Sequence, residues 1–190
     1  MAKLKLSDVR LSFPDLWEPV EFQAGDGKPR YNASFLIPKG GTTDKLIQTA
    51  IAAVAEEKFG PKAKARLAAF QKAGDVCYAD GDEKEYDGYA GMMVLSTHRR
   101  AQDGPVGVYS NAIDPQTGKV AILPNGCGRP YAGCYVNASV EIYATEGKFP
   151  GIRGGLVAVQ FVRDGDAFSG SKPPTPDDFE PLAIEEGDLV

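Results

Sequence analysis

The sequence predicts a mainly β protein, with helices inserted between strands, folded as one domain. Several segments alternate apolar and polar residues with the period of two that strands show. The 22 glycines and 14 prolines supply many turns and argue against a helical bundle. A chain of 190 residues, 43% of them hydrophobic, can bury one substantial core. We expect a folded domain over residues 1–168, a linker rich in Pro, Ser and Gly over 169–176, and a disordered acidic tail over 177–190.

Two strands are predicted before the helices. Residues 3–13 form the first, because their apolar members continue a period of two: Leu4, Leu6, Val9, Leu11 and Phe13. The turn sequence GDGKPR at residues 25–30 then leads into a second strand at residues 31–39. One face of that strand is apolar and consists of Tyr31, Ala33, Phe35 and Ile37.

Two helices are predicted next. Thr42 or Thr43 caps a helix that runs to about residue 59, where Gly60 and Pro61 stop it. A shorter helix covers residues 63–72. Both are rich in alanine and amphipathic, so we expect them to cover the core rather than to carry chemistry.

The remainder of the domain is predicted to contain strands and their connections. Residues 80–91 form a charged hairpin tip, residues 92–100 a strand, and residues 104–130 a long hairpin connection. The strand at residues 131–144 has a core face and a wet, aromatic face, which carries Tyr135, Asn137, Ser139, Glu141 and Tyr143. The strand at residues 155–165 has almost no polar alternation and is expected to be buried on both faces.

The negative charge of the chain is concentrated at its end. The net charge is −5, but the chain has 21 Lys and Arg residues, all before residue 173, and six of its 26 acidic residues lie after residue 176. The first 176 residues therefore carry 21 positive and 20 negative charges, a net charge of +1. The sequence contains no apolar run long enough to span a membrane and no signal peptide at its start, so we expect a cytoplasmic protein.

The cysteines do not predict a disulfide framework or a metal site. Cys77, Cys127 and Cys134 are odd in number and lack CxxC spacing. Together with His98, the only histidine, they have the composition of a Cys3His zinc site, but structural zinc ligands come in close pairs. We expect ordinary thiols and no metal or other cofactor.

Signals for enzyme chemistry are weak. No GxSxG, HExxH or phosphate-loop motif is present. A run of carboxylates has the composition of a metal-dependent nuclease site, formed by Asp80, Asp82, Glu83, Glu85 and Asp87. The spacing does not match an EF-hand and Lys84 interrupts the charge. A solvated hairpin tip is therefore the preferred interpretation, and the nuclease remains an alternative.

Signals for binding are stronger as a set. Aromatic rings stack on bases and cations follow phosphates, and this mixture is typical of proteins that hold single-stranded nucleic acid. The candidate DNA-binding residues, at strand ends or on wet strand faces, are Arg30, Tyr31, Lys39, Lys84, Tyr86, Arg99, Arg100, Arg129, Tyr135, Asn137 and Tyr143. Tyr135 and Tyr143 lie roughly 26 Å apart along their strand, so a bound strand of DNA has to cross several β-strands.

The order of several segments resembles a known family. These segments are YNASFLIPK, EEKFG, DGDE, YDGYAG, THRR, YAGCYVNASVEIYA, RDGDAF and DDFEPL, and they resemble the phage-encoded single-stranded-DNA-binding proteins of the OB-fold type. The resemblance covers nearly the whole chain. It implies a five-stranded OB-type barrel with helical and hairpin insertions, little sequence preference, no catalysis, and a role in phage replication, recombination or repair in a bacterial host. A homodimer is a further possibility.

The tail combines acidic and apolar residues. They are Asp177, Asp178, Phe179, Glu180, Leu182, Ile184, Glu185, Glu186 and Asp188. In relatives such tails are taken to recruit replication proteins, of the phage or of its host. As a tethered polyanion the tail also competes with DNA for a cationic groove. Many relatives end on an aromatic residue, whereas this chain ends on Leu189 and Val190. The alternatives are a tail that only maintains solubility, or a phage structural or assembly protein.

Overall fold

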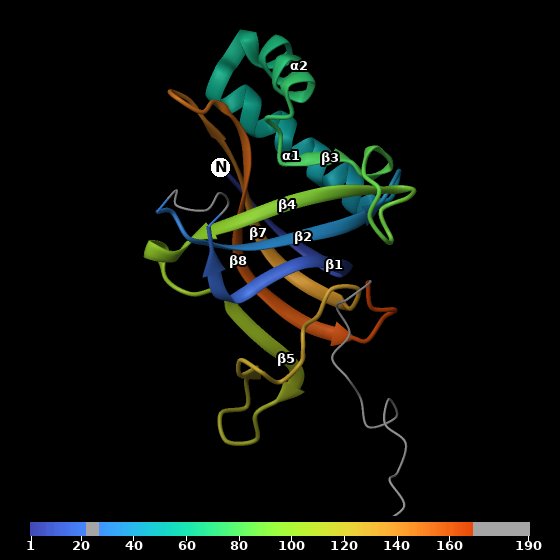
Figure 1. Ribbon diagram of the computed structural model, residues 1–190. Coiled ribbons are helices and arrows are strands. Elements are labelled where there is room, and N and C mark those ends of the chain that lie inside the picture. The colour runs from blue at the N-terminus through green and yellow to red at the C-terminus, as the bar shows by residue number, and fades with distance from the viewer. Residues whose placement is uncertain (22–26, 169–190) are drawn as a thin grey trace, which may run out of the picture.

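The computed structural model describes residues 1–21 and 27–168 and shows a β-barrel with added helices and strands (Figure 1). One sheet contains the strands in the order β3-β4-β2-β1-β7-β8-β5-β6, and β4 also pairs with β8. That last pairing closes five strands, β1, β2, β4, β8 and β7, into a ring. The prediction of a mainly β fold with a five-stranded OB-type barrel is therefore confirmed. The predicted linker and acidic tail, from residue 169 onward, lie outside the described residues.

The elements follow the predicted order closely. The strands are β1 Ala2–Val20, β2 Arg30–Pro38, β3 Tyr78–Asp80, β4 Met92–Arg100, β5 Gly107–Ile113, β6 Val120–Ile122, β7 Tyr135–Thr145 and β8 Gly151–Arg163. The helices are α1 Thr42–Phe59 and α2 Ala63–Ala73, and short 3-10 turns cover Gly60–Lys62, Gly81–Glu83 and Ala101–Asp103. No helix in the described part of the chain is long and apolar enough to cross a membrane.

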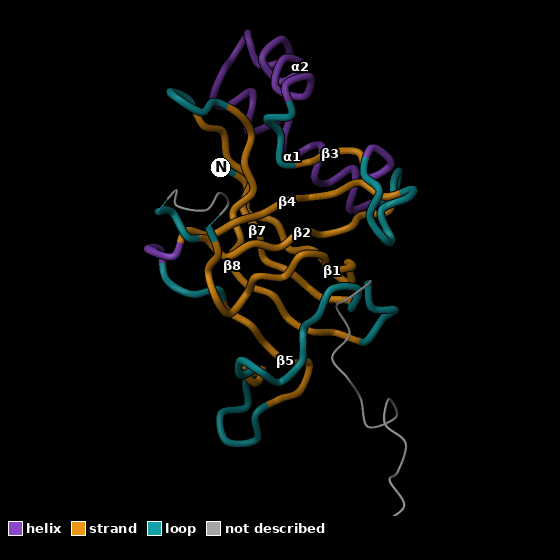
Figure 2. The backbone as a smooth tube through the Cα atoms, in the orientation of Figure 1, coloured by secondary structure: helices purple, strands orange, loops and turns teal. Residues whose placement is uncertain are grey.

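The core fills the inside of the barrel. The barrel strands cross one another in the middle of the molecule, and helices α1 and α2 lie at one end (Figure 2). On β7 the buried and half-buried residues alternate strictly from Tyr135 to Tyr143, because successive side chains of a strand point to opposite faces. Helix α1 adds Ile47, Ile51 and Val54 to the same core. The wet face predicted for β7 is therefore confirmed as the outer surface of the barrel.

Strand β1 contains two bulges that the period of two did not predict. Asp8 and Phe13 have positive φ angles of 51° and 47°, and the register shifts between Leu6 and Val9 and again between Ser12 and Asp15. An extra residue at each bulge keeps the following apolar residues directed inward. Phe13 was expected on the core face, but the bulge turns its side chain outward and leaves it 51% exposed.

Helix α1 begins without the predicted threonine cap. Gly41 is the N-cap residue and makes no side-chain capping bond. The carboxylate of Asp44 instead accepts hydrogen bonds from the backbone N–H of Gly40, from Gln48 and from the hydroxyl of Tyr78. The prediction of a Thr42 or Thr43 cap is wrong because a buried carboxylate one turn later binds these donors.

The segment predicted as a connection over residues 104–130 contains the hairpin of β5 and β6. Strand β5 pairs in parallel with β8, so the hairpin widens the sheet beyond the barrel, at the end away from the helices (Figure 1). Strand β8 is half-buried at alternate positions. The expectation that both of its faces are buried is therefore wrong, since only one faces the core.

A second, smaller cluster lies outside the barrel wall. Leu36 of β2 and Val94 of β4 are covered there by Tyr89, with Phe168 packed beside them. The loop that carries Tyr89 is fixed at its base, where Lys39 Nζ contacts Asp80 and Asp82 at 2.5 Å each. Gly81 has no room for a side chain, because an added Cβ would lie 2.5 Å from the carbonyl oxygen of Tyr89. The predicted hairpin tip is thus a packed cover over one end of the β2 and β4 outer face.

Candidate nucleic-acid interface

The outer face of β2 and β4 carries two arginines at directly opposite positions. Arg30 pairs with Arg100 in the antiparallel register, and the next outward pair is Asn32 with His98. Like charges directly opposite one another destabilise an antiparallel pair. A surface that keeps two guanidinium groups together is therefore suited to an anionic ligand.

Barrel closure brings Tyr143 of β7 and Arg153 of β8 to this end of the face. His98 pairs with Gly155 of β8, and Tyr143 pairs with Arg153 on the neighbouring strands β7 and β8. Burial, followed by the positive charges of Arg30, Arg153 and Arg100, lowers the pKa of His98 below its ordinary value of 6.5. We refer to Arg30, His98, Arg100 and Arg153 as the arginine cluster.

Tyr143 lies beside the arginine cluster. Burial raises the pKa of its hydroxyl, while the charges of Arg100 and Arg153 act in the opposite direction. Arg153 also donates to Asp75 at 3.0 Å, and Arg100 donates to Asp103 at 2.9 Å. The Tyr143 ring therefore lies next to guanidinium groups that are paired with exposed or half-exposed carboxylates.

An aromatic pocket of about 560 Å³ lies farther along the same side of the barrel. Its lining residues are Ser12, Phe13, Pro14, Asp15, Glu85, Tyr86, Asp87, Ala132 and Phe168. Three of these are acidic, and none is Lys or Arg. Asp15 pairs in register with Asn32 of β2, so the pocket adjoins the face that carries the arginine cluster.

The rings of the pocket form a ladder built on a buried tyrosine. The hydroxyl of Tyr89 donates to Ser12 at 3.1 Å, and Tyr89 is only 1% exposed. The Tyr86 ring packs edge-on against Tyr89 at 5.2 Å between centroids, and Phe13 packs edge-on against Tyr86 at 5.1 Å. Tyr86 is 54% exposed, so the outer two rings are held in place and remain open to solvent.

A second group of cations lies at the other end of β7. The Arg163 guanidinium sits 3.4 Å from the centroid of the Tyr135 ring and makes two hydrogen bonds of 3.0 Å to Asp8. Asn137 accepts from the backbone N–H of Asp8 and donates to Gln160. Tyr135 and Asn137 are therefore brought together here, away from Tyr143.

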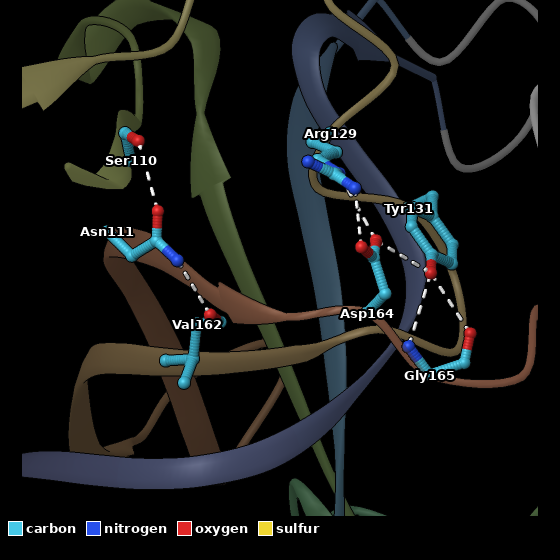
Figure 3. Close-up of polar contacts among 7 residues, drawn as sticks. All are labelled: Ser110, Asn111, Arg129, Tyr131, Val162, Asp164 and Gly165. Atoms are coloured by element: carbon cyan, nitrogen blue, oxygen red, sulfur yellow. Dashed lines mark hydrogen bonds and ion pairs between the residues drawn. The ribbon is translucent and has the colours of Figure 1, made fainter.

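Arg129 is paired with a carboxylate at the end of β8 (Figure 3). Its guanidinium contacts Asp164, whose Oδ1 also accepts from the hydroxyl of Tyr131 at 3.0 Å. Near the same end of β8, Asn111 of β5 donates to the carbonyl oxygen of Val162 at 2.9 Å. These contacts fix the chain where β8 ends.

Two of the predicted DNA-binding residues are directed away from the outer face. Tyr31 is 9% exposed and belongs to the core. Arg99 is its register partner and donates to the carbonyl oxygen of Gly104 at 2.8 Å. Both positions alternate with outward ones, so the expectation that Tyr31 offers a free stacking surface is wrong, and Arg99 serves the turn after β4.

The carboxylates of the nuclease alternative do not form a metal site. Asp80 and Asp82 are occupied by Lys39, and Lys84 is exposed on the same loop. Within residues 1–21 and 27–168, no group of three or more His, Cys, Asp or Glu side chains is arranged to hold a metal ion. Lys39, predicted to contact DNA, is committed to these two carboxylates.

Several residues of the face were not among the sequence candidates. Arg153 and Arg163 face outward on β8. The prediction that residues 155–165 are buried on both faces hid the orientation of Arg163, and Arg153 lies before the start of that predicted strand. Phe13 was assigned to the core because the bulge was not predicted. The sequence did contain a signal for Arg153. It follows the apolar Ile152, so in a strand its side chain points to the opposite face from that of Ile152.

A five-stranded barrel of this topology, with cations and open rings on its outer face, defines a protein of the oligonucleotide-binding OB class. Residues 2–190 match the family model described as "Enterobacter phage Enc34, ssDNA-binding protein". The chain belongs to this family of phage single-stranded-DNA-binding proteins, and the resemblance found in the sequence is confirmed.

Individual relatives are similar over most of the chain. "Putative protein p50" of Acyrthosiphon pisum secondary endosymbiont phage 1 is 40% identical over 188 residues, which cover 97% of this chain and 96% of the relative. The single-stranded DNA-binding protein of bacteriophage Enc34, solved in complex with ssDNA, has a TM-score of 0.65 at 23% identity, covering 87% of this chain and 88% of that chain. Bacteriophage T7 gp2.5, a single-stranded DNA binding protein, has a TM-score of 0.55 at 12% identity, covering 86% and 92%. The two solved structures share the fold.

Proposed function

We propose that this chain binds single-stranded DNA across the outer face of β2 and β4, with phosphates at the arginine cluster. The observation that carries the proposal is the register pairing of Arg30 with Arg100 on the outer face. In OB barrels, the face of the second and third barrel strands binds oligonucleotides. In this chain those strands are β2 and β4, and family membership supports the ligand.

Stacking surfaces lie at both ends of the proposed track. Tyr143 adjoins the arginine cluster, and Tyr86 with Phe13 lies at the aromatic pocket. Four residue steps along β2, from Arg30 to Ser34, separate the two ends by about 13 Å. The bound strand therefore runs along β2 and β4, with bases placed on rings and phosphates on cations.

The cations around Tyr135 extend the track over β7 and β8. Arg163, beside Tyr135, and Arg129, near the end of β8, are each more than 45% exposed and paired with a carboxylate, as Arg100 is in the arginine cluster. Exposed ion pairs contribute little to stability, so phosphate exchanges readily for carboxylate in the same fork geometry. Asn137 supplies a polar contact beside Tyr135, and Lys84 adds a charge on the loop that forms the pocket.

The acidic tail competes with DNA for these cations and recruits replication proteins of the phage or its host in this proposal. The support is compositional, since residues 177–190 contain six carboxylates and no Lys or Arg. A polyanion tethered to the barrel has a high effective concentration at any cationic face. The protein would act in replication, recombination or repair, by covering exposed single strands.

We propose no catalytic role for the chain. Two of the five carboxylates of the nuclease alternative, Asp80 and Asp82, are paired with Lys39. The alternative of a phage structural or assembly protein predicts no affinity for DNA. Fluorescence anisotropy of labelled oligo-dT, titrated with the full-length chain at low salt, distinguishes a DNA-binding protein from a structural one. Saturable binding supports the proposal, and absence of binding ends it.

A further inference from the structure

Phe13 has an unusual position for an apolar ring. The bulge at Phe13 moves it from the core to the surface of β1, and its φ of 47° is strained for a bulky residue. Bulges commonly re-aim a side chain near a functional site. The Phe13 ring itself adds nothing to the core, so its strained and exposed position indicates that the ring has a use.

The ring forms one wall of the aromatic pocket. A volume of about 560 Å³ falls in the range of small-molecule sites, which are largely apolar with a few polar groups. The apolar walls are Phe13, Pro14, Tyr86, Ala132 and Phe168. The ladder from Tyr89 through Tyr86 to Phe13 fixes two of these walls before any ligand arrives.

The charges of the pocket restrict what enters it. Asp15, Glu85 and Asp87 line it, and no lining residue is cationic. The Arg10 guanidinium lies 4.6 Å from the centroid of the Phe168 ring, and it donates to the carbonyl oxygens of Gly133 and Asp166. Carboxylates at neutral pH only accept hydrogen bonds, so a phosphate is repelled and a group with N–H donors is favoured. The acidic tail is excluded for the same reason, because it carries six carboxylates and no Lys or Arg.

We propose that the aromatic pocket takes one unstacked base of the bound strand and favours bases with an exocyclic amino group, such as cytosine and adenine, over thymine. The inference rests on the proposed function, because the base belongs to a strand of DNA bound on the β2 and β4 face. The pocket adjoins that face through the pairing of Asp15 with Asn32. The base lies against Phe13 and Tyr86, and its amino group donates to a rim carboxylate. Cytosine N4 and adenine N6 are donors, whereas thymine presents O4 and a methyl group at the equivalent position. The phosphates stay outside, toward the arginine cluster.

The test compares oligo-dC, oligo-dA and oligo-dT of equal length by competition in fluorescence anisotropy. We expect the full-length chain to prefer oligo-dC to oligo-dT by about two- to tenfold, the effect of a hydrogen bond. Glu85→Gln should reduce that ratio toward one. Glu83→Gln is the matched control, because it removes the same charge from the same loop at a residue that does not line the pocket. Both variants remove one negative charge from the chain, so the ratio of affinities is the informative quantity.

Phe13→Asn tests the stacking wall without disturbing the bulge, since asparagine tolerates a positive φ. It should weaken binding of every oligonucleotide by about fivefold or more. Equal affinities for oligo-dC and oligo-dT in the parent chain would overturn the base preference, as would equal ratios in Glu85→Gln and Glu83→Gln. Unchanged affinity in Phe13→Asn would mean that another ligand, such as a cationic peptide, uses the pocket. No binding of any oligonucleotide would instead reject the proposed function itself.

Discussion

Arg30 and Arg100 occupy directly opposite positions on the antiparallel strands β2 and β4, with His98 and Arg153 beside them. Such an arrangement contributes repulsion to the free protein and attraction once a polyanion is bound. The fold thus keeps a cationic face on a body that is almost neutral.

Neighbouring arginines at the end of β4 should differ in their effect on DNA binding. Arg100 lies on the outer face, whereas Arg99 is directed to the turn and donates to Gly104. Arg100→Gln should weaken binding of oligo-dT about fivefold, as expected for one exposed charge contact. Arg99→Gln, measured in the same anisotropy assay, should change affinity much less and lower the melting temperature instead. The reverse order of effects would contradict the assignment of the face.

DNA affinity should depend on pH through His98. Its pKa is lowered in the free protein by burial and by the surrounding arginines, so the imidazole is neutral at pH 7. A phosphate at the cluster favours the imidazolium and raises this pKa, so binding takes up a proton and becomes tighter as pH falls toward the lowered pKa of the free protein. We expect tighter binding of oligo-dT at pH 5.5 than at pH 7.5 in the parent chain, and a flatter profile in His98→Asn.

The same pKa shift should make the free protein less stable at low pH, although DNA affinity increases there. The folded state resists protonation of His98, while the unfolded state takes up a proton near pH 6.5. The contribution of this residue to the free energy of unfolding is therefore complete above pH 6.5 and is lost as pH falls. Denaturant titrations at pH 7.5 and pH 5.5 should show a smaller loss of stability for His98→Asn than for the parent chain, and an equal loss would count against the shift.

Asp44 should be a stability determinant at the start of α1. Burial raises the pKa of its carboxyl, but hydrogen bonds from Gly40, Gln48 and Tyr78 outweigh burial and lower it overall. Asp44→Asn leaves donors facing donors and should cost about 1–3 kcal/mol in the free energy of unfolding. Because the pKa is lowered, the stabilisation is present above the ordinary value of 3.8 and is lost as the carboxyl protonates in acid. Glu56→Gln, on the exposed side of the same helix, is the control in urea titrations.

The carboxylates near Lys39 should show no nuclease activity. Lys39 Nζ contacts Asp80 and Asp82 at 2.5 Å each, where a catalytic metal would require open ligands. Labelled single-stranded DNA incubated with the chain and Mg²⁺ or Mn²⁺ should remain intact on a denaturing gel. Cleavage that disappears in Asp82→Asn would revive the nuclease alternative.

The order and type of the main elements were predictable from the sequence, because a period of two and helix-stop residues are local signals. The position of Phe13 was not, since one extra residue at a bulge reverses the face of each following side chain and leaves no clear signature without glycine. Tyr31 illustrates a different limit. Its alternation with Ala33 and Phe35 placed it on the core face, yet its chemistry also fitted base stacking, and burial in the barrel excludes that use.

The candidate site was predicted in part. Arg30, Arg100 and Tyr143 were all selected from the sequence, but only barrel closure between β4 and β8 brings them together with Arg153. The partners of the cations were not predictable either. Arg129, Arg163 and Lys39 contact carboxylates more than 30 residues away along the chain, and such contacts depend on the tertiary fold.

Binding of oligo-dT as a function of salt tests the central claim most directly. The full-length chain, a version truncated after Pro176 and the double variant Arg30→Ala/Arg100→Ala should be titrated side by side. We predict saturable binding at low salt, tighter binding after truncation, and a salt slope reduced by about 1.4 in the double variant, or about 0.7 for each lost phosphate contact. Absence of binding at low salt, or equal affinity and equal slope in the double variant and the parent chain, would contradict the account.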